Sequence, residues 1–238
     1  MNMKTLLLGA AASVAIAPAA FGAAHEGERG RDGEVKVIYW QAPSIMTPYL
    51  SGGTKDLEAA SLVLEPMGRY DETGALVPYL ATEIPTVENG GVAEDLKSIT
   101  WKLKEGLVWS DGTPVTSADL KFTAEYCMHP EGGCAQASKF DGVESIDIVD
   151  DLTVTVHFTD AKPNPYGPFM GAQSPIIQAA QFKDCLGAKA PECTEANFNP
   201  IGTGPFRFDE WRKGDSVHLV QNADYWGDTP HSSHLFKR

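Results

Sequence analysis

The chain has 238 residues and a formal net charge of −13 at pH 7. This acidity argues against nucleic acid as a partner, because phosphates bind clustered lysine and arginine, and against an anionic membrane surface. It favours a soluble protein that stays monomeric, and the length suffices for one large domain or two small ones.

Residues 1–24 have the pattern of a secretory signal peptide. Lys4 gives a short positive start, an apolar segment follows, and small residues lead to an expected cleavage after Gly22 or Ala24. A membrane anchor is the alternative, but the apolar run is short for a bilayer and Pro18 interrupts it. The pattern therefore predicts export to the periplasm.

The four cysteines lie in the exported part and form two local groups, Cys127 with Cys134 and Cys185 with Cys193. Four cysteines allow three pairings, and the sequence does not choose among them. Local pairing is the simplest, since each pair closes a short loop with Gly or Pro, and export supplies an oxidising compartment. A zinc site is the alternative, but it needs closer cysteine spacing or several histidines, and only His129 is near.

Secondary structure in the first part of the chain begins after a polar segment, residues 25–34, that we expect to be a disordered linker. Residues 35–40 read as a strand, and a loop rich in Gly and Pro follows over 41–53. Asp56 could cap a helix that runs through Leu64.

The middle of the chain alternates apolar and polar residues over 99–103, which predicts a half-buried strand. A turn at 111–114 leads to a helix with Thr116 as N-cap and Asp119 as the partner in a capping box. This helix should end near Pro130, because the residue before a proline resists helical geometry.

Two hairpins and a short helix complete the prediction. The first hairpin covers 146–158, the helix 175–182, and the second hairpin 206–219 with a turn at 213–215. Strands and helices occur without strict alternation, so the fold class is α+β or mixed α/β.

Motifs for catalysis and metal binding are absent from the sequence. Neither G-x-S-x-G nor H-E-x-x-H occurs, and the pair His231 and His234 has no third ligand nearby. The glycines at 202 and 204 lack the third glycine of a nucleotide loop. We therefore expect no catalytic residue, metal or cofactor, and a secreted hydrolase is the least favoured function.

Three segments resemble the family-5 extracellular solute-binding proteins, which include the dipeptide, oligopeptide and nickel receptors of ABC importers. WKLKEGLVWSDGTPVTSADLKFT at 101–123 matches a strand, a D-G-T-P turn and a helix start, although Trp109-Ser110 departs from the usual pair. PIGTGPFRFDEW followed by NADYWG at 200–227 matches a second motif. Pro48-Tyr49 with 64–67 gives a shorter third match.

The resemblance implies two lobes that close on a solute, with a domain inserted in the first lobe. Residues 35–70 and 200–238 would belong to the first lobe and 71–199 to the inserted domain. The opposite lobe would follow in sequence, so we expect this chain to be the N-terminal part of a longer receptor. Because the chain departs from the family pattern after residue 227, we expect a truncated or frame-shifted gene model.

The implied function is capture of a peptide, or another small solute, for delivery to an inner-membrane ABC permease. The loop after the first strand should touch the solute, because ligands bind at strand ends in such sheets; the alternative is a loop that merely connects. A receptor for nickel, an opine or an oligosaccharide and a nonfunctional fragment remain alternative functions. The candidate ligand residues are Trp40, Gln41, Tyr49, Ser51, Gly52 and Gly53.

Overall fold

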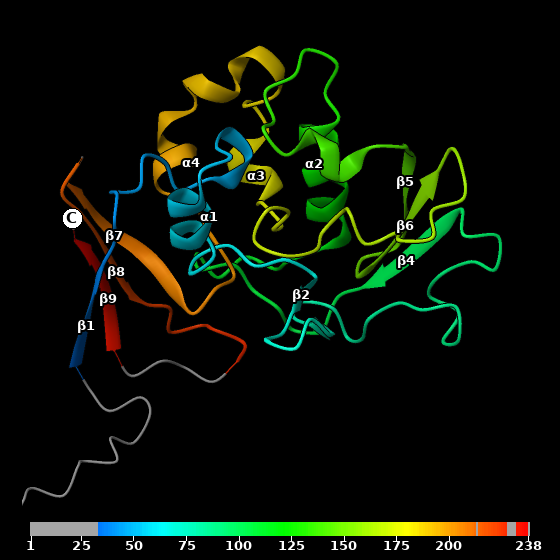
Figure 1. Ribbon diagram of the computed structural model, residues 1–238, viewed down its shortest axis with the longest axis horizontal. Coiled ribbons are helices and arrows are strands. Elements are labelled where there is room, and N and C mark those ends of the chain that lie inside the picture. Colours follow the sequence, from blue (N-terminus) through cyan, green and yellow to red (C-terminus); the bar gives the residue numbers. More distant parts are fainter. Residues whose placement is uncertain (1–32, 213, 228–231, 238) are drawn as a thin grey trace, which may run out of the picture.

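The computed structural model describes residues 33–212, 214–227 and 232–237. The fold is mixed α/β, with a four-stranded sheet at one end, a three-stranded sheet at the other and helices between them (Figure 1). The predicted signal peptide, most of the predicted linker and His231 lie outside the described residues. Within the described part, no helix combines the length and apolarity needed to cross a membrane.

The four-stranded sheet joins the two ends of the described chain. Its strands are β1 (Gly33–Ile38), β7 (Phe206–Arg212), β8 (Ser216–Gln221) and β9 (Ser232–Lys237), in the order β1-β9-β8-β7. The predicted hairpin β7–β8 is confirmed, and β1 pairs parallel with β9. Residues 33 and 34 belong to β1, which corrects the linker boundary, and β9 was not predicted.

The three-stranded sheet contains β4 (Ser98–Lys102), β5 (Val143–Asp150) and β6 (Thr153–Phe158), antiparallel in the order β4-β6-β5. The predicted alternation is confirmed in β4 and β6, whose apolar side chains are buried between partly or fully exposed neighbours, whereas Ile148 of β5 is 47% exposed. The hydroxyls of Thr100 and Thr155 lie 2.9 Å apart across the partly exposed face. Branched and hydroxyl side chains suit such a half-buried sheet.

Helix α2 (Ser117–Cys127) begins with the predicted capping box at Thr116. The Thr116 N–H donates to Asp119 Oδ2 at 3.0 Å, so one of the free donors at the helix start is satisfied. Asp119 also accepts from the Trp109 indole and the Ala179 amide. One buried carboxylate thus fastens α2 to the preceding turn and to α3 (Ala179–Phe182).

Helix α1 (Thr54–Ala60) differs from the prediction. Its N-cap is Gly53, Asp56 lies inside the first turn, and the helix ends at Ala60 rather than Leu64. Asp56 does not cap the helix, because its carboxylate accepts hydrogen bonds from Ser44 and Ser51, which lie before the helix. The remaining elements are η1 (Pro48–Leu50), β2 (Gly68–Tyr70), β3 (Leu76–Pro78), η2 (Ala137–Phe140), η3 (Gly187–Glu192) and α4 (Thr194–Phe198).

Two clusters of buried apolar residues support the sheets. The larger one lies around the three-stranded sheet and α2, and includes the fully buried Trp101 and the almost fully buried Trp109. The smaller one joins α1 to the four-stranded sheet. It contains Met46, Ala59, Val63, Phe206, Val217 and Leu219.

Both local disulfides predicted from the sequence are present, Cys127–Cys134 and Cys185–Cys193. Their loops pack against each other, since a side chain at Gly133 would overlap the carbonyl of Gly187. The two bonds therefore stabilise one shared region beside the end of α2.

Candidate functional site

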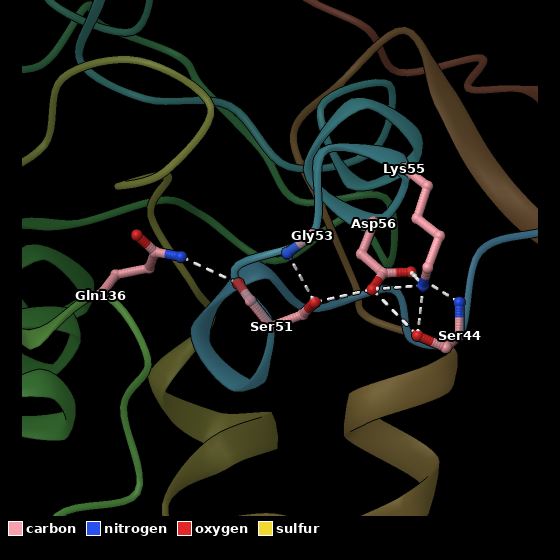
Figure 2. A network of polar contacts seen from close by, with 6 residues as sticks. All are labelled: Ser44, Ser51, Gly53, Lys55, Asp56 and Gln136. Atoms are coloured by element: carbon pink, nitrogen blue, oxygen red, sulfur yellow. Dashed lines mark hydrogen bonds and ion pairs between the residues drawn. The ribbon is translucent and has the colours of Figure 1, made fainter. Parts of the chain in front are cut away.

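A polar network surrounds Asp56, which is only 1% exposed, at the start of α1 (Figure 2). Its carboxylate accepts from the Ser44 amide at 2.5 Å, the Ser51 hydroxyl at 2.6 Å and Lys55 Nζ at 2.8 Å. Lys55 Nζ also donates to Ser44 Oγ at 2.5 Å. The network therefore connects the loop after β1 to the first turn of the helix.

The Asp56 carboxylate stays ionised because its partners outweigh its burial. Burial alone would raise its pKa, but the hydrogen bonds from Lys55, Ser51 and Ser44 hold the pKa of this carboxyl below its usual range. A buried carboxylate that remains charged needs such donors. Asp56 thus acts as a fixed negative anchor for Ser44 and Ser51.

Gln136 holds the same loop from the opposite side. Its side-chain amide donates to the Ser51 carbonyl at 2.8 Å and to the Pro48 carbonyl at 3.3 Å. Figure 2 shows Gln136 and Asp56 on either side of Ser51, one bonded to its carbonyl and the other to its hydroxyl. Ser51 is therefore fixed both in its backbone and in its side chain.

The predicted ligand residues fall into three environments. Trp40 is 73% exposed, and Gln41 and Gly52 are exposed, so these three offer surface to a solute. Ser51 and Gly53 are partly buried within the polar network, and the Gly53 amide donates to Ser51 Oγ at 3.0 Å. Ligand contact by these residues stays a prediction.

Tyr49 is completely buried and lies beneath the loop instead of on its surface. Its hydroxyl donates to the carbonyl of Pro175, and its ring lies 5.7 Å from that of Tyr126. Burial raises the pKa of Tyr49 well above its usual value. In this structure Tyr49 supports the loop from within and has no exposed surface for a solute.

A second buried carboxylate, Glu65, joins two of the three segments that carry the family resemblance, 64–67 and 200–227. It accepts from Thr203 Oγ1 at 3.2 Å, the Tyr225 hydroxyl at 3.2 Å and the Trp226 indole at 2.7 Å. Burial raises the pKa of Glu65, and these donors together with the nearby Arg69 offset that rise only in part. Two of the shared motifs thus meet at Glu65, which we call the Glu65 junction.

Two residues of this region were missed by sequence reasoning. Asp56 was interpreted as a helix cap, because its position before an apolar run fits that role, and Gln136 was assigned no role. No local pattern marks Gln136, since its partners lie 85 and 88 residues away in sequence. Only the folded arrangement brings it to the loop.

The sequence profile described as bacterial extracellular solute-binding proteins, family 5 middle, matches residues 75–235. The chain belongs to this family of solute-binding proteins. The match includes the D-G-T-P turn and the G-T-G segment, so the recognition made from these motifs is confirmed. Among the described residues of this solute-binding chain, no group of three His, Cys, Asp or Glu side chains is arranged to hold a metal ion.

Curated relatives of this solute-binding protein are considerably longer. Protein XP55 of Streptomyces lividans is 30% identical over 189 residues, covering 79% of this chain and 32% of the relative. A Brucella ovis protein named as an ABC transporter peptide-binding protein is 28% identical over 151 residues, covering 62% of this chain and 27% of the relative. The chain therefore spans about a third of the length of the relatives it matches.

A solved structure confirms the fold. The oligopeptide-binding protein AppA from Bacillus subtilis, in complex with a nonapeptide, superposes with a TM-score of 0.79 at 21% identity. The match covers 88% of this chain and 40% of AppA. This solute-binding chain thus has the architecture of part of a periplasmic binding protein.

Proposed function

We propose that this chain contributes to the capture of short peptides by a periplasmic receptor, which then delivers them to an inner-membrane ABC permease. Family membership supports capture of a solute, and the name of the Brucella ovis relative favours a peptide. The receptor would bind its solute without converting it, and would act as a monomer without nucleic acid. Export to the periplasm would follow from the predicted signal peptide.

The proposed solute surface is formed by Trp40, Gln41, Ser51, Gly52 and Gly53, with Tyr49 supporting it from below. The exposed Trp40 indole would cover apolar parts of the solute. The loop backbone around Gly52 would hydrogen-bond to the peptide main chain, which is common to all sequences. Asp56 and Gln136 hold this loop in one shape before the solute arrives.

We also propose a division into lobes. Residues 35–70 and 200–238 would form part of the first lobe, and 71–199 the inserted domain. The smaller buried cluster supports this division, because its members come only from residues 46–63 and 206–219. Closure of the first lobe on an opposite lobe would then enclose the solute.

The test of this function uses the secreted product of the gene, purified from its host. Calorimetric titration with trialanine and with glutathione should show binding, whereas nickel with histidine should not, and chromatography should recover both peptides intact. Peptide turnover that one point mutation abolishes, or binding of nickel with histidine alone, would contradict the proposal.

Trp40→Ala tests the solute surface, and Tyr70→Ala is the matched control. Tyr70 is also an exposed aromatic, at 54%, but it lies on β2 away from the loop. Removal of an aromatic anchor should weaken peptide binding by about 1–2 kcal/mol in Trp40→Ala. Equal affinities of the two variants would place the solute elsewhere.

A further inference from the structure

The loop at residues 48–51 is fixed by two consecutive residues that are distant in sequence. In addition to the two bonds from Gln136, the Ala135 amide donates to the Tyr49 carbonyl at 2.6 Å. Three of the four carbonyls in this short segment are therefore turned inward onto Ala135 and Gln136. Gln136 is 5% exposed, so water cannot readily replace its bonds.

A disulfide determines where this pair of residues can lie. Ala135 directly follows Cys134, which is bonded to Cys127, the last residue of α2. The intervening Gly132 and Gly133 both have positive φ, and as glycines they have no Cβ to restrict the backbone to that conformation. The covalent bond to the helix therefore fixes the position from which Ala135 and Gln136 reach the loop.

The same end of α2 also supports the loop from below. Tyr126 immediately precedes Cys127, and its ring packs against Tyr49. We propose that Gln136, anchored by the Cys127–Cys134 disulfide, is a positioning residue that holds the solute loop in its binding shape. The part of this inference that concerns solute rests on the proposed function.

Gln136 can position the loop because Ser51 is held from two sides. Its carbonyl is bound by Gln136 and its hydroxyl by Asp56, so neither its backbone nor its side chain is free to rotate. Loss of the Gln136 bonds would remove the partner of the partly buried Ser51 carbonyl and leave the Pro48 carbonyl only the Ser51 amide, which favours other loop conformations. A loop that samples many conformations binds more weakly, because ordering it opposes association.

The first experiment measures amide hydrogen exchange at residues 49–53 in the purified secreted gene product. Gln136→Ala should speed this exchange on the order of tenfold, as expected for loss of buried hydrogen bonds. Gln136→Glu keeps the shape but removes both donors, so it should have the same effect. The double variant Cys127→Ser/Cys134→Ser should also exchange faster. If this variant does not fold, the two Gln136 variants alone test the proposal.

Gln178→Ala is the matched control. Gln178 is 4% exposed, and its amide also makes two hydrogen bonds, but with Asp111 and Thr113 at the turn before α2. Its loss should lower the thermal midpoint as much as Gln136→Ala does and leave amide exchange at residues 49–53 unchanged. Equal acceleration in both variants would show a general loss of stability and overturn the proposal.

The second experiment compares affinity for trialanine and glutathione in the same variants. Gln136→Ala and Gln136→Glu should bind about tenfold more weakly than wild type, and Gln178→Ala should bind normally. Unchanged exchange in the Gln136 variants, or faster exchange with unchanged affinity, would overturn the positioning role. A wild-type protein that binds neither peptide would instead refute the proposed function, and exchange alone would then decide whether Gln136 holds the loop.

Discussion

Gly202 lies where the backbone of the G-T-G segment crosses Leu62 and Val63, just after α1. A Cβ at this position would overlap the Val63 carbonyl oxygen, and one at Gly204 would lie 2.7 Å from that of Leu62. Backbone atoms cannot move aside as a flexible side chain can. The glycines of this motif therefore allow two backbone segments to pack closely.

Gly202→Ala should lower the free energy of unfolding by roughly 1–3 kcal/mol or more, because the added methyl forces two backbone segments apart. Gly52→Ala is the matched control, since no atom lies within 4 Å of the place that its added methyl would occupy. Urea denaturation would measure both variants. Similar stabilities would show that the G-T-G segment can shift without cost.

Glu65 should make stability decrease as pH rises above its ordinary pKa of 4.5. Between the ordinary pKa and the raised pKa of the folded state, folded Glu65 keeps a proton that unfolded Glu65 has lost. Rising pH therefore favours unfolding between these two pKa values. Glu65→Gln lacks this titration, so its stability relative to wild type should improve from just below that value to neutral pH. Urea denaturation at a series of pH values over this range measures the effect, and Glu58→Gln, at an exposed glutamate, is the control. Parallel stability–pH curves for wild type and Glu65→Gln would contradict the raised pKa of Glu65.

At the scale of elements, Asp119 supports more than the start of its own helix. It accepts from Thr116, Trp109 and Ala179, so three segments depend on one carboxylate. Burial raises its pKa despite these donors. The capping box therefore also joins α2 to α3 and to the turn before it.

Asp119→Ala should destabilise the protein by about 2 kcal/mol or more, which is the upper end for a lost cap, because buried donors are also left unpaired. Glu125→Ala is the control on the same helix. It removes only an exposed pair with Lys121 at 4.0 Å and should change stability by less than about 0.5 kcal/mol. Comparable losses in thermal unfolding would refute the special role of Asp119.

Elements with local signals were predictable from the sequence. The start of α2 has its capping box within four residues, and β6 shows strict alternation, so both were recognised. The start of α1 could not be placed, because the role of Asp56 depends on Ser44, twelve residues away. Strand β9 has no comparable pattern, and its pairing with β1 and β8 defines it.

At the scale of the whole molecule, the disulfides give a direct chemical test. All four cysteines pair within short loops, so the oxidised protein should show no free thiol after denaturation. Reduction should then release four thiols. Titration with a thiol reagent would measure both states, and peptide mapping of the oxidised protein should give only local pairs; free thiols before reduction would contradict the structure.

The candidate site was predictable only in outline. The resemblance identified the family and the loop after the first strand, and the structure leaves Trp40 and Gly52 exposed there. The burial of Tyr49 and the role of Gln136 could not be foreseen, since both depend on α2 packing beneath the loop. Side chains that position a site are defined by the tertiary fold.

The pairing of β1 with β9 has a consequence for the order of folding. These are the first and last strands of the described chain, with Gly33 opposite Ser232, and the Glu65 junction bridges 161 residues to Trp226. Contacts between residues so distant in sequence form slowly, because the entropy lost on closing the loop opposes them before the contacts contribute stabilising energy. The three-stranded sheet and α2 need only residues 98–158 and can assemble early. The four-stranded sheet, and with it the packing of α1 and of the loop before it, should therefore form last.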